Sequence, residues 1–194
     1  MANFMDRNPA FKVLIDRSTV NVVEIAAAFR TLLNVFVDLN ARMPSAHAWK
    51  DRKLQHCLSC AKEIEAVVDL LGLRDSRDLW VIAFAAGLHD FGRLKQVVEP
   101  REGQKPVEHG RDGAELIREQ LHFVRGHESE LWQVILAAIE QHSMVKNPTV
   151  EDLRVLYPLL DEVAIAALAA LIGIVRDIDR VSGFKDAIRY TREK

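Results

Sequence analysis

Apolar residues recur at spacings of three and four through almost the whole chain, and strand-like alternation is nearly absent. In the first such segment, Val22, Ile25 and Phe29 predict a helix that Ser18 caps and that runs to about Asn40. Pro44 then breaks the helical pattern. The next predicted helices cover 51–71, ending at Gly72, and run from Ser76 to a point between His89 and Leu94.

The second half of the chain continues the helical pattern. Residues 97–107, which include Pro100, Gly103 and Pro106, are predicted to form a loop. No Gly/Ser-rich linker divides the chain and no fixed-period repeat is visible, so the sequence predicts a single all-α domain. Further helices are predicted over 110–122, 129–142, 151–156, 161–181 and 183–192.

Composition narrows the class of protein. With 194 residues, 49% of them hydrophobic, the chain can bury one sizeable core and is not expected to be disordered. A net charge of -2 argues against a general nucleic-acid-binding surface. Two cysteines do not make a disulfide framework, which indicates a reducing compartment.

The sequence predicts neither a membrane span nor a secretory signal. The longest apolar run, 163–175, has 13 residues, short of the roughly 20 that cross a bilayer. Charged residues such as Arg7, Lys12 and Asp16 precede the first apolar segment, which polar residues also break. The expectation is therefore a soluble, cytoplasmic protein with no membrane partner.

His89-Asp90 is the most informative pair of residues, because it places an imidazole and a carboxylate side by side at the end of an apolar helical run. Both groups are ordinary ligands of divalent metal ions. A second apolar run, late in the chain, is followed by the charged segment 176–181. Because an isolated charge is costly to bury, such charges either leave the core or face a buried ion.

The order of these groups resembles the HD superfamily of metal-dependent phosphohydrolases. The resemblance covers roughly residues 50 to 185 and includes the surroundings of the ligands. Residues 88–93 (Leu-His-Asp-Phe-Gly-Arg) are similar to the family's LHDxGR segment, and 176–181 (Arg-Asp-Ile-Asp-Arg-Val) to its RDADRL segment. Glu108-His109-Gly110, with Gly113, resembles the intervening xHxxxG segment.

The resemblance implies a helical bundle of the HD type over residues 46–194 and a metal centre within it. An N-terminal helical extension, 1–45, then packs on the core or forms a homodimer contact. The implied centre holds one or two divalent transition metal ions, namely Fe, Mn, Zn, Co or Ni. Its implied ligands are His56, His89, Asp90 and a late aspartate for one ion, and His109 and His142 for a second, with Asp90 bridging.

The late ligand has two candidates, Asp177 and Asp179. They stand two positions apart, about 200° round a helix, so both cannot face one site. Asp179 is preferred because a basic and an apolar residue follow it, as they follow the family's ligand. Asp177 then supports a ligand or pairs with an arginine.

Arg93 follows the His-Asp pair, and its planar guanidinium matches phosphate oxygens. The resemblance thus implies Asp90 and Arg93 as the catalytic residues and Arg93 and Lys95 as substrate-binding residues, with Arg111 a weaker candidate. Cys57 and Cys60 form a C-x-x-C pair without a second pair or a βαβ context, and packing is the expected role. No role is assigned to His47, His122 and His127.

The implied activity is hydrolysis of a phosphoester bond in a small phosphorylated substrate, a nucleotide or a related compound, by a metal-activated water. Two alternatives stay open: a mixed-valent di-iron oxygenase on the same ligand set, and a non-catalytic signalling module. The chain lacks the Gly-Tyr-Pro segment of the cyclic-dinucleotide branch and any Gly-rich phosphate loop. No specific nucleic-acid partner is expected.

Overall fold

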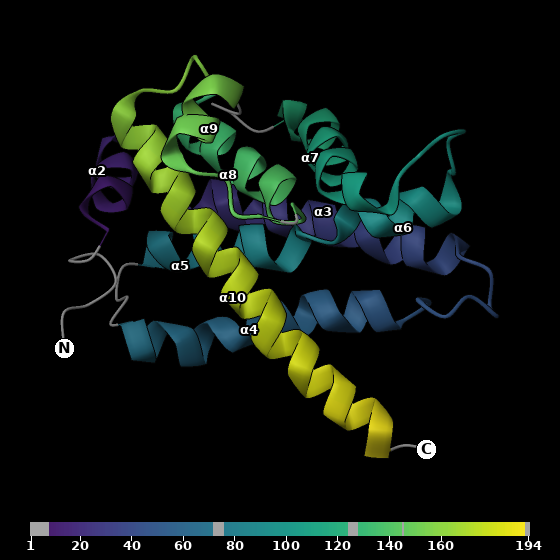
Figure 1. The fold of residues 1–194 in the computed structure, drawn as a ribbon. Coiled ribbons are helices and arrows are strands. Elements are labelled where there is room, and N and C mark those ends of the chain that lie inside the picture. Colours follow the sequence, from purple (N-terminus) through teal and green to yellow (C-terminus); the bar gives the residue numbers. More distant parts are fainter. Residues whose placement is uncertain (1–7, 72–75, 124–127, 145, 193–194) are drawn as a thin grey trace.

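The computed structural model describes residues 8–71, 76–123, 128–144 and 146–192. All regular structure in these residues is helical, and none of them forms a strand, so the predicted all-α class is confirmed (Figure 1). The α-helices are α2 (Pro9–Arg17), α3 (Val22–Arg42), α4 (Arg52–Leu71), α5 (Ser76–Leu88), α6 (Phe91–Val98), α7 (His109–Gln120), α8 (Glu130–Gln141), α9 (Val150–Leu156) and α10 (Glu162–Arg192). Two 3₁₀ turns, η1 (Pro106–Glu108) and η2 (Leu121–Phe123), flank α7.

Helix α10 runs diagonally across the molecule and packs against α2, α4, α5, α8 and α9 (Figure 1). Its first half is the apolar run seen in the sequence, and Leu168, Leu171 and Val175 are completely buried there. Helix α5 lies between α3, α4, α8 and α10. Its Phe84 ring meets Trp132 of α8 edge to face at 5.0 Å, which fills the centre of the bundle.

Helices α2 and α3 belong to the same hydrophobic core as the rest of the bundle. Helix α2 packs on α10, and α3 packs on α5 and α6. Phe11 and Phe36 are fully buried, and Phe36 meets Phe91 of α6 at 5.0 Å. These contacts describe how residues 8–45 pack. The predicted division of the chain at residue 45 stays a prediction.

Several predicted helix bounds are wrong. Residues 9–17 form α2, which the sequence reading did not predict, and Ser18 is its C-cap. Asn21 caps α3, since its side chain accepts a bond from the Glu24 amide and the Glu24 carboxylate accepts one from the Asn21 amide. The predicted end of a helix at Gly72 lies outside the described residues.

The connections after α5 and within α10 also differ from prediction. Helix α5 ends at Leu88, and α6 is a separate helix that continues to Val98, so the predicted loop over 97–107 begins later. The predicted break between 181 and 183 does not occur. Helix α10 continues through Ser182 and Gly183. Ser182 is buried within it, and a Cβ added at Gly183 would have no atom within 4 Å.

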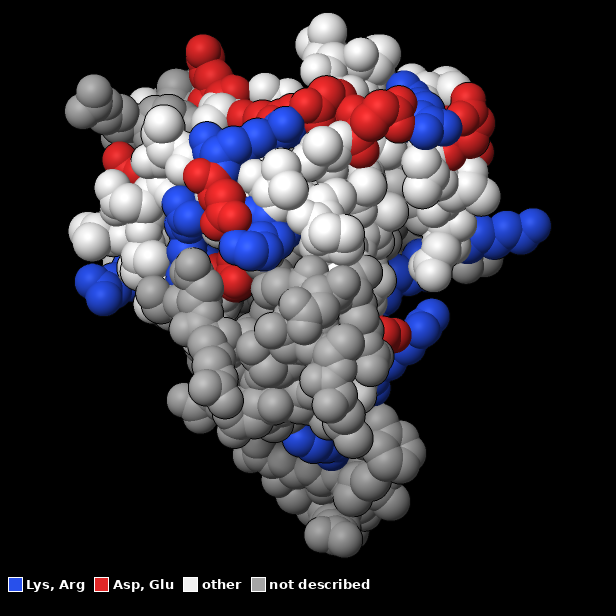
Figure 2. All heavy atoms as spheres, turned by 90° about the vertical axis from the view of Figure 1, so that its left-hand side faces the viewer, with Lys and Arg blue, Asp and Glu red and all other residues white. Residues whose placement is uncertain are grey.

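The described charged side chains near α2 and the start of α10 are paired with opposite charges. Arg17 binds Glu130 and Asp161, and Arg154 binds Glu162 at 2.6 Å. Figure 2, which views the molecule from the α2 side, shows basic and acidic groups next to one another on this face.

No single helix among the described residues is long and apolar enough to cross a membrane. Helices α2 and α3 reach that length and composition only together, and the chain bends by 96° between them.

Candidate metal centre

Residues from five helices or helix ends meet at one place in the bundle, where the histidines and Asp90 are buried and the side chain of Asp179 is 40% exposed. His56 lies within α4, and Asp179 lies on α10. His89 and Asp90 are the two turn residues between α5 and α6. His109 is the first residue of α7. His142 is the C-cap of α8, so helix ends supply most of the groups.

The turn formed by His89 and Asp90 allows the side chains of these two consecutive residues to face the same centre. Asp90 occupies the N-cap position of α6 with φ -90° and ψ 10°, a sparsely populated backbone region. An aspartate there ordinarily caps its own helix, but this side chain makes no capping hydrogen bond. Its carboxylate is therefore directed to the centre instead of to the α6 amides.

Two glycines let the helix ends approach closely enough. A Cβ on Gly92 of α6 would lie 2.0 Å from the carbonyl oxygen of His109. A Cβ on Gly110 of α7 would lie 2.4 Å from the carbonyl oxygen of Glu140 on α8. Only residues without a side chain fit at these crossings, which bring Asp90, His109 and His142 together.

Three imidazole rings are oriented in the same way by the main chain. The Nδ1 atoms of His89, His109 and His142 lie 2.7, 2.8 and 2.6 Å from the carbonyl oxygen three residues earlier. A carbonyl oxygen only accepts, so each Nδ1 is the donor, and the lone pair of a neutral ring is then on Nε2. This is the tautomer of a histidine that binds a metal through Nε2.

One half of the centre contains His109, His142 and Asp90. The two Nε2 atoms are 3.1 Å apart, and Asp90 Oδ1 lies 3.3 Å from that of His109. Two lone pairs that face each other at this distance need a proton or a cation between them. Ligands that share one ion through bonds of 2.0–2.2 Å are about 2.8–3.5 Å apart, which agrees with both distances.

The other half contains His56, His89 and Asp179. Asp179 Oδ1 lies 3.0 Å from His56 Nε2 and 3.4 Å from His89 Nε2. Within the described part of the chain, His89 Nε2 is fully buried and has no hydrogen-bond partner. Such a buried, unsatisfied nitrogen beside two carboxylates fits a metal ligand.

The two late aspartates lie in different surroundings. Asp179 faces the centre. Asp177 is at the surface, where its side chain is 77% exposed and 3.3 Å from the guanidinium of Arg180. The predicted half-turn of helix between the two aspartates separates a candidate ligand from a solvated acid.

Asp90 connects the two halves. Its Oδ2 lies 3.6 Å from His89 Nε2, and its Oδ1 faces His109. Lys53 Nζ also donates to Oδ2 at 2.5 Å, and Arg93 Nε donates to Oδ1 at 2.6 Å. Burial raises the pKa of Asp90, but the opposing charges of these neighbours outweigh burial and hold the pKa well below its usual value.

The other pKa values describe a centre that attracts positive charge. Burial lowers the pKa of His89, yet Asp90 and Asp179 raise it to about 9. Burial, together with the charge of His89, lowers the pKa of His142 to about 3. Burial raises the pKa of Asp179, but its contacts with His56 and His89 prevail and lower it. Anionic carboxylates and a neutral imidazole are the forms that bind metal.

Two cations stand between the centre and solvent. The side chains of Lys53 and Arg93 are 24% and 27% exposed, whereas that of Asp90 is 3% exposed. The guanidinium of Arg93 also lies over the ring of Trp49, 5.6 Å from its centroid, which restrains it. No hydrogen bond or ion pair among the described residues joins Lys95 to the centre, and Arg111 pairs with Glu108 on the surface.

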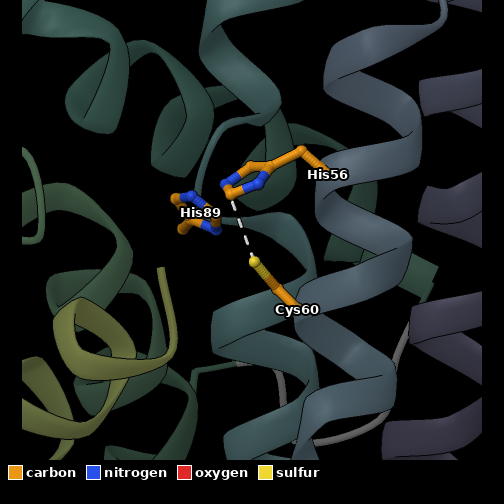
Figure 3. Close-up of side chains that lie close together, drawn as sticks. All are labelled: His56, Cys60 and His89. Carbon is orange, nitrogen blue, oxygen red and sulfur yellow. Dashed lines mark hydrogen bonds between the residues drawn. The ribbon is translucent and has the colours of Figure 1, made fainter. Parts of the chain in front are cut away.

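Two residues that lie at the centre, Lys53 and Cys60, were not among the predicted site residues. Lys53 is bound to Asp90, and Cys60 Sγ lies 3.6 Å from His56 Nε2 (Figure 3). Both stand one turn from His56 on α4, which is the signal that could have indicated them. His47 lies against Trp49, His122 is exposed, and His127 lies outside the described residues.

Comparisons of the chain with protein-family models, with curated proteins and with solved structures find no match. Among the described residues, two buried groups of side chains could hold a metal ion. These are His56, Cys60 and His89, and His89, Asp90 and His142, with the ligand atoms in each group within 4.8 Å of one another.

Proposed function

We propose that the chain is a metal-dependent phosphohydrolase of the HD type, which hydrolyses a phosphoester bond in a small phosphorylated substrate, a nucleotide or a related compound. One observation carries the proposal. A buried carboxylate, Asp90, lies between two sets of ligand-type groups and binds two cations that reach solvent.

The residues fit one or two ions. His56, His89 and Asp179 would hold one, His109 and His142 the other, and Asp90 would contact both. Imidazole and carboxylate together suit Fe, Mn, Zn, Co or Ni and do not select one of them. When bound, such ions supply a water of lowered pKa and polarise a phosphoryl oxygen.

Lys53 and Arg93 give the site its preference for an anionic substrate. With Nε bound to Asp90, the two terminal amino groups of Arg93 are the donors available for phosphate oxygens. Lys53 adds a second positive charge on the other oxygen of Asp90. Both cations are partly exposed, so a phosphate can reach them without opening the core.

The test combines metal analysis with a hydrolysis screen. The purified chain, loaded in turn with each of the five metals, is expected to hydrolyse a generic phosphoester or members of a nucleotide panel. His89→Ala and Asp90→Ala are expected to lose bound metal and hydrolysis while keeping their helix content. His122→Ala removes an exposed histidine and is the matched control, with metal content and activity unchanged.

Unchanged metal content in both His89→Ala and Asp90→Ala would contradict the assignment of the centre. Intact metal binding without hydrolysis of any phosphoester would contradict the activity. Oxygen consumption by the iron-loaded chain, with a mixed-valent iron signal in electron paramagnetic resonance, would favour the oxygenase alternative instead.

A further inference from the structure

The sulfur of Cys60 lies beside two histidines of the centre, although a buried cysteine in a helix most often only packs. It follows His56 by four residues on α4, so both side chains lie on the same face of the helix. Cys60 is completely buried, and Figure 3 shows its sulfur directed toward the imidazole of His56, with His89 next to both. The ligand atoms of these three residues lie within 4.8 Å of one another.

A second observation points to the same place. His89 Nε2 is buried, and none of the described residues completes a hydrogen bond with it. Its Nδ1 is already engaged by the carbonyl oxygen of Ala86 at 2.7 Å. The nitrogen that remains is therefore buried without a hydrogen bond, next to a sulfur and a carboxylate, where a bound cation would satisfy it.

The distances agree with a shared tetrahedral ion. Bonds of about 2.3 Å to sulfur and about 2.1 Å to nitrogen at a tetrahedral angle place the two ligand atoms about 3.6 Å apart. Cys60 Sγ and His56 Nε2 are separated by 3.6 Å. Asp179 Oδ1, at 3.0 and 3.4 Å from the two imidazole nitrogens, is close enough to complete the set.

We propose that Cys60 binds the ion held by His56, His89 and Asp179, so that this half of the centre is a mixed nitrogen, sulfur and oxygen site. A thiolate ligand selects zinc, cobalt or iron over magnesium or calcium. On binding, the thiol gives its proton to solvent and a metal–sulfur bond forms. The inference rests on the proposed metal centre but is independent of the reaction catalysed there.

Cobalt(II) titration followed by absorption spectroscopy tests the inference without an activity assay. The wild-type chain, titrated to saturation, is expected to show a near-ultraviolet sulfur-to-cobalt charge-transfer band. Cys57→Ala is the matched control, because it removes a buried sulfur from the same helix, and it is expected to keep the band. Cys60→Ala and Cys60→Ser are expected to lose the band while the visible cobalt bands of the other half remain.

Circular dichroism establishes that each variant is folded. X-ray absorption of the zinc-saturated wild-type chain needs no variant, and it is expected to show a sulfur neighbour at about 2.3 Å. Cobalt bound without a charge-transfer band, a band that persists in Cys60→Ala, or zinc with only nitrogen and oxygen neighbours would each overturn the role of Cys60 alone. Failure of the wild-type chain to bind cobalt or zinc would overturn the metal centre as well.

Discussion

Asp90 is a nearly fully buried carboxylate whose two oxygens face different histidines. An isolated carboxylate in such a position is costly, because burial removes the water that stabilises its charge. Lys53 and Arg93 offset this cost with one charge-assisted hydrogen bond each. The pair of cations thus keeps Asp90 ionised and also presents positive charge at the solvent side of the centre.

Replacing Lys53 by Met removes one of these charges and keeps most of the side-chain volume. A hydrogen bond to a charged group contributes about 1.5–3 kcal/mol, so kcat/KM for a phosphoester is expected to fall roughly 10- to 100-fold. Metal content is expected to stay near that of the wild type, because Lys53 is not a ligand. Lys12→Met, in an exposed pair with Asp16, is the control. A kcat/KM equal to that of the wild type would show that Lys53 has no part in binding the phosphate.

Most side chains of the centre lie at helix ends, and close crossings between the helices bring those ends together. Gly92 places the start of α6 against the carbonyl oxygen of His109, and Gly110 places the start of α7 against the last turn of α8. The crossings are backbone against backbone, so no side-chain rotation can relieve an added methyl group. The geometry of the ligands is therefore coupled directly to the packing of α6, α7 and α8.

Gly92→Ala is expected to separate α6 from α7 and to lower both stability and metal content. Its Cβ would lie 2.0 Å from a carbonyl oxygen, and overpacking of this kind costs about 1–3 kcal/mol. Gly173→Ala is the matched control within α10, where an added Cβ has nothing within 4 Å, and it is expected to gain up to about 1 kcal/mol. Urea denaturation and metal analysis measure both effects. Wild-type values for Gly92→Ala would mean that the crossing tolerates a side chain.

The sequence predicted the helical class and most helices, because apolar periodicity directly reports a buried helix face. It placed a break near Gly183, but one glycine costs only about 1 kcal/mol and the helix continues through it. Helix α2 was missed although Pro9 at its start and the buried Phe11, Leu14 and Ile15 give a helical repeat. The helix has only nine residues, so its repeat covers little more than two turns and gives a weak periodic signal.

The sequence predicted only part of the candidate site. The order of the histidines and aspartates could be followed along the chain, and the structure brings those residues together. The contact between Lys53 and Asp90 spans 37 positions and depends on how α4 packs on α5, which local patterns do not encode. The spacing of Cys60 from His56 could have indicated that both lie on one face of a helix. The C-x-x-C pattern that Cys60 forms with Cys57 favoured a packing role instead.

At the scale of the whole molecule, the centre joins parts of the chain that are far apart in sequence. Helices α4, α7, α8 and α10, and the turn between α5 and α6, each supply at least one group. An ion bound by all of them would link the helices that surround the core, and the unfolded chain offers no such arrangement. Binding free energy at the centre is therefore expected to appear as folding stability.

Metal removal is expected to lower the melting temperature. An ion at one hundred times its dissociation constant stabilises the folded chain by about 2.7 kcal/mol. For a chain of this length, that corresponds to a shift of roughly 5–11 °C, measured by thermal unfolding with and without a chelator. Asp90→Ala is expected to show a much smaller shift. Identical melting temperatures, with metal shown to be bound in one sample, would contradict a centre that links the helices.

The main-chain carbonyls behind His89, His109 and His142 would affect how strongly an ion bound at the centre acts as a Lewis acid. A carboxylate in that position makes an imidazole a stronger electron donor to its metal. A neutral carbonyl donates less, so more of the positive charge of a bound ion stays available to an anionic substrate. The same three hydrogen bonds that orient the rings would thus also favour a more electrophilic centre.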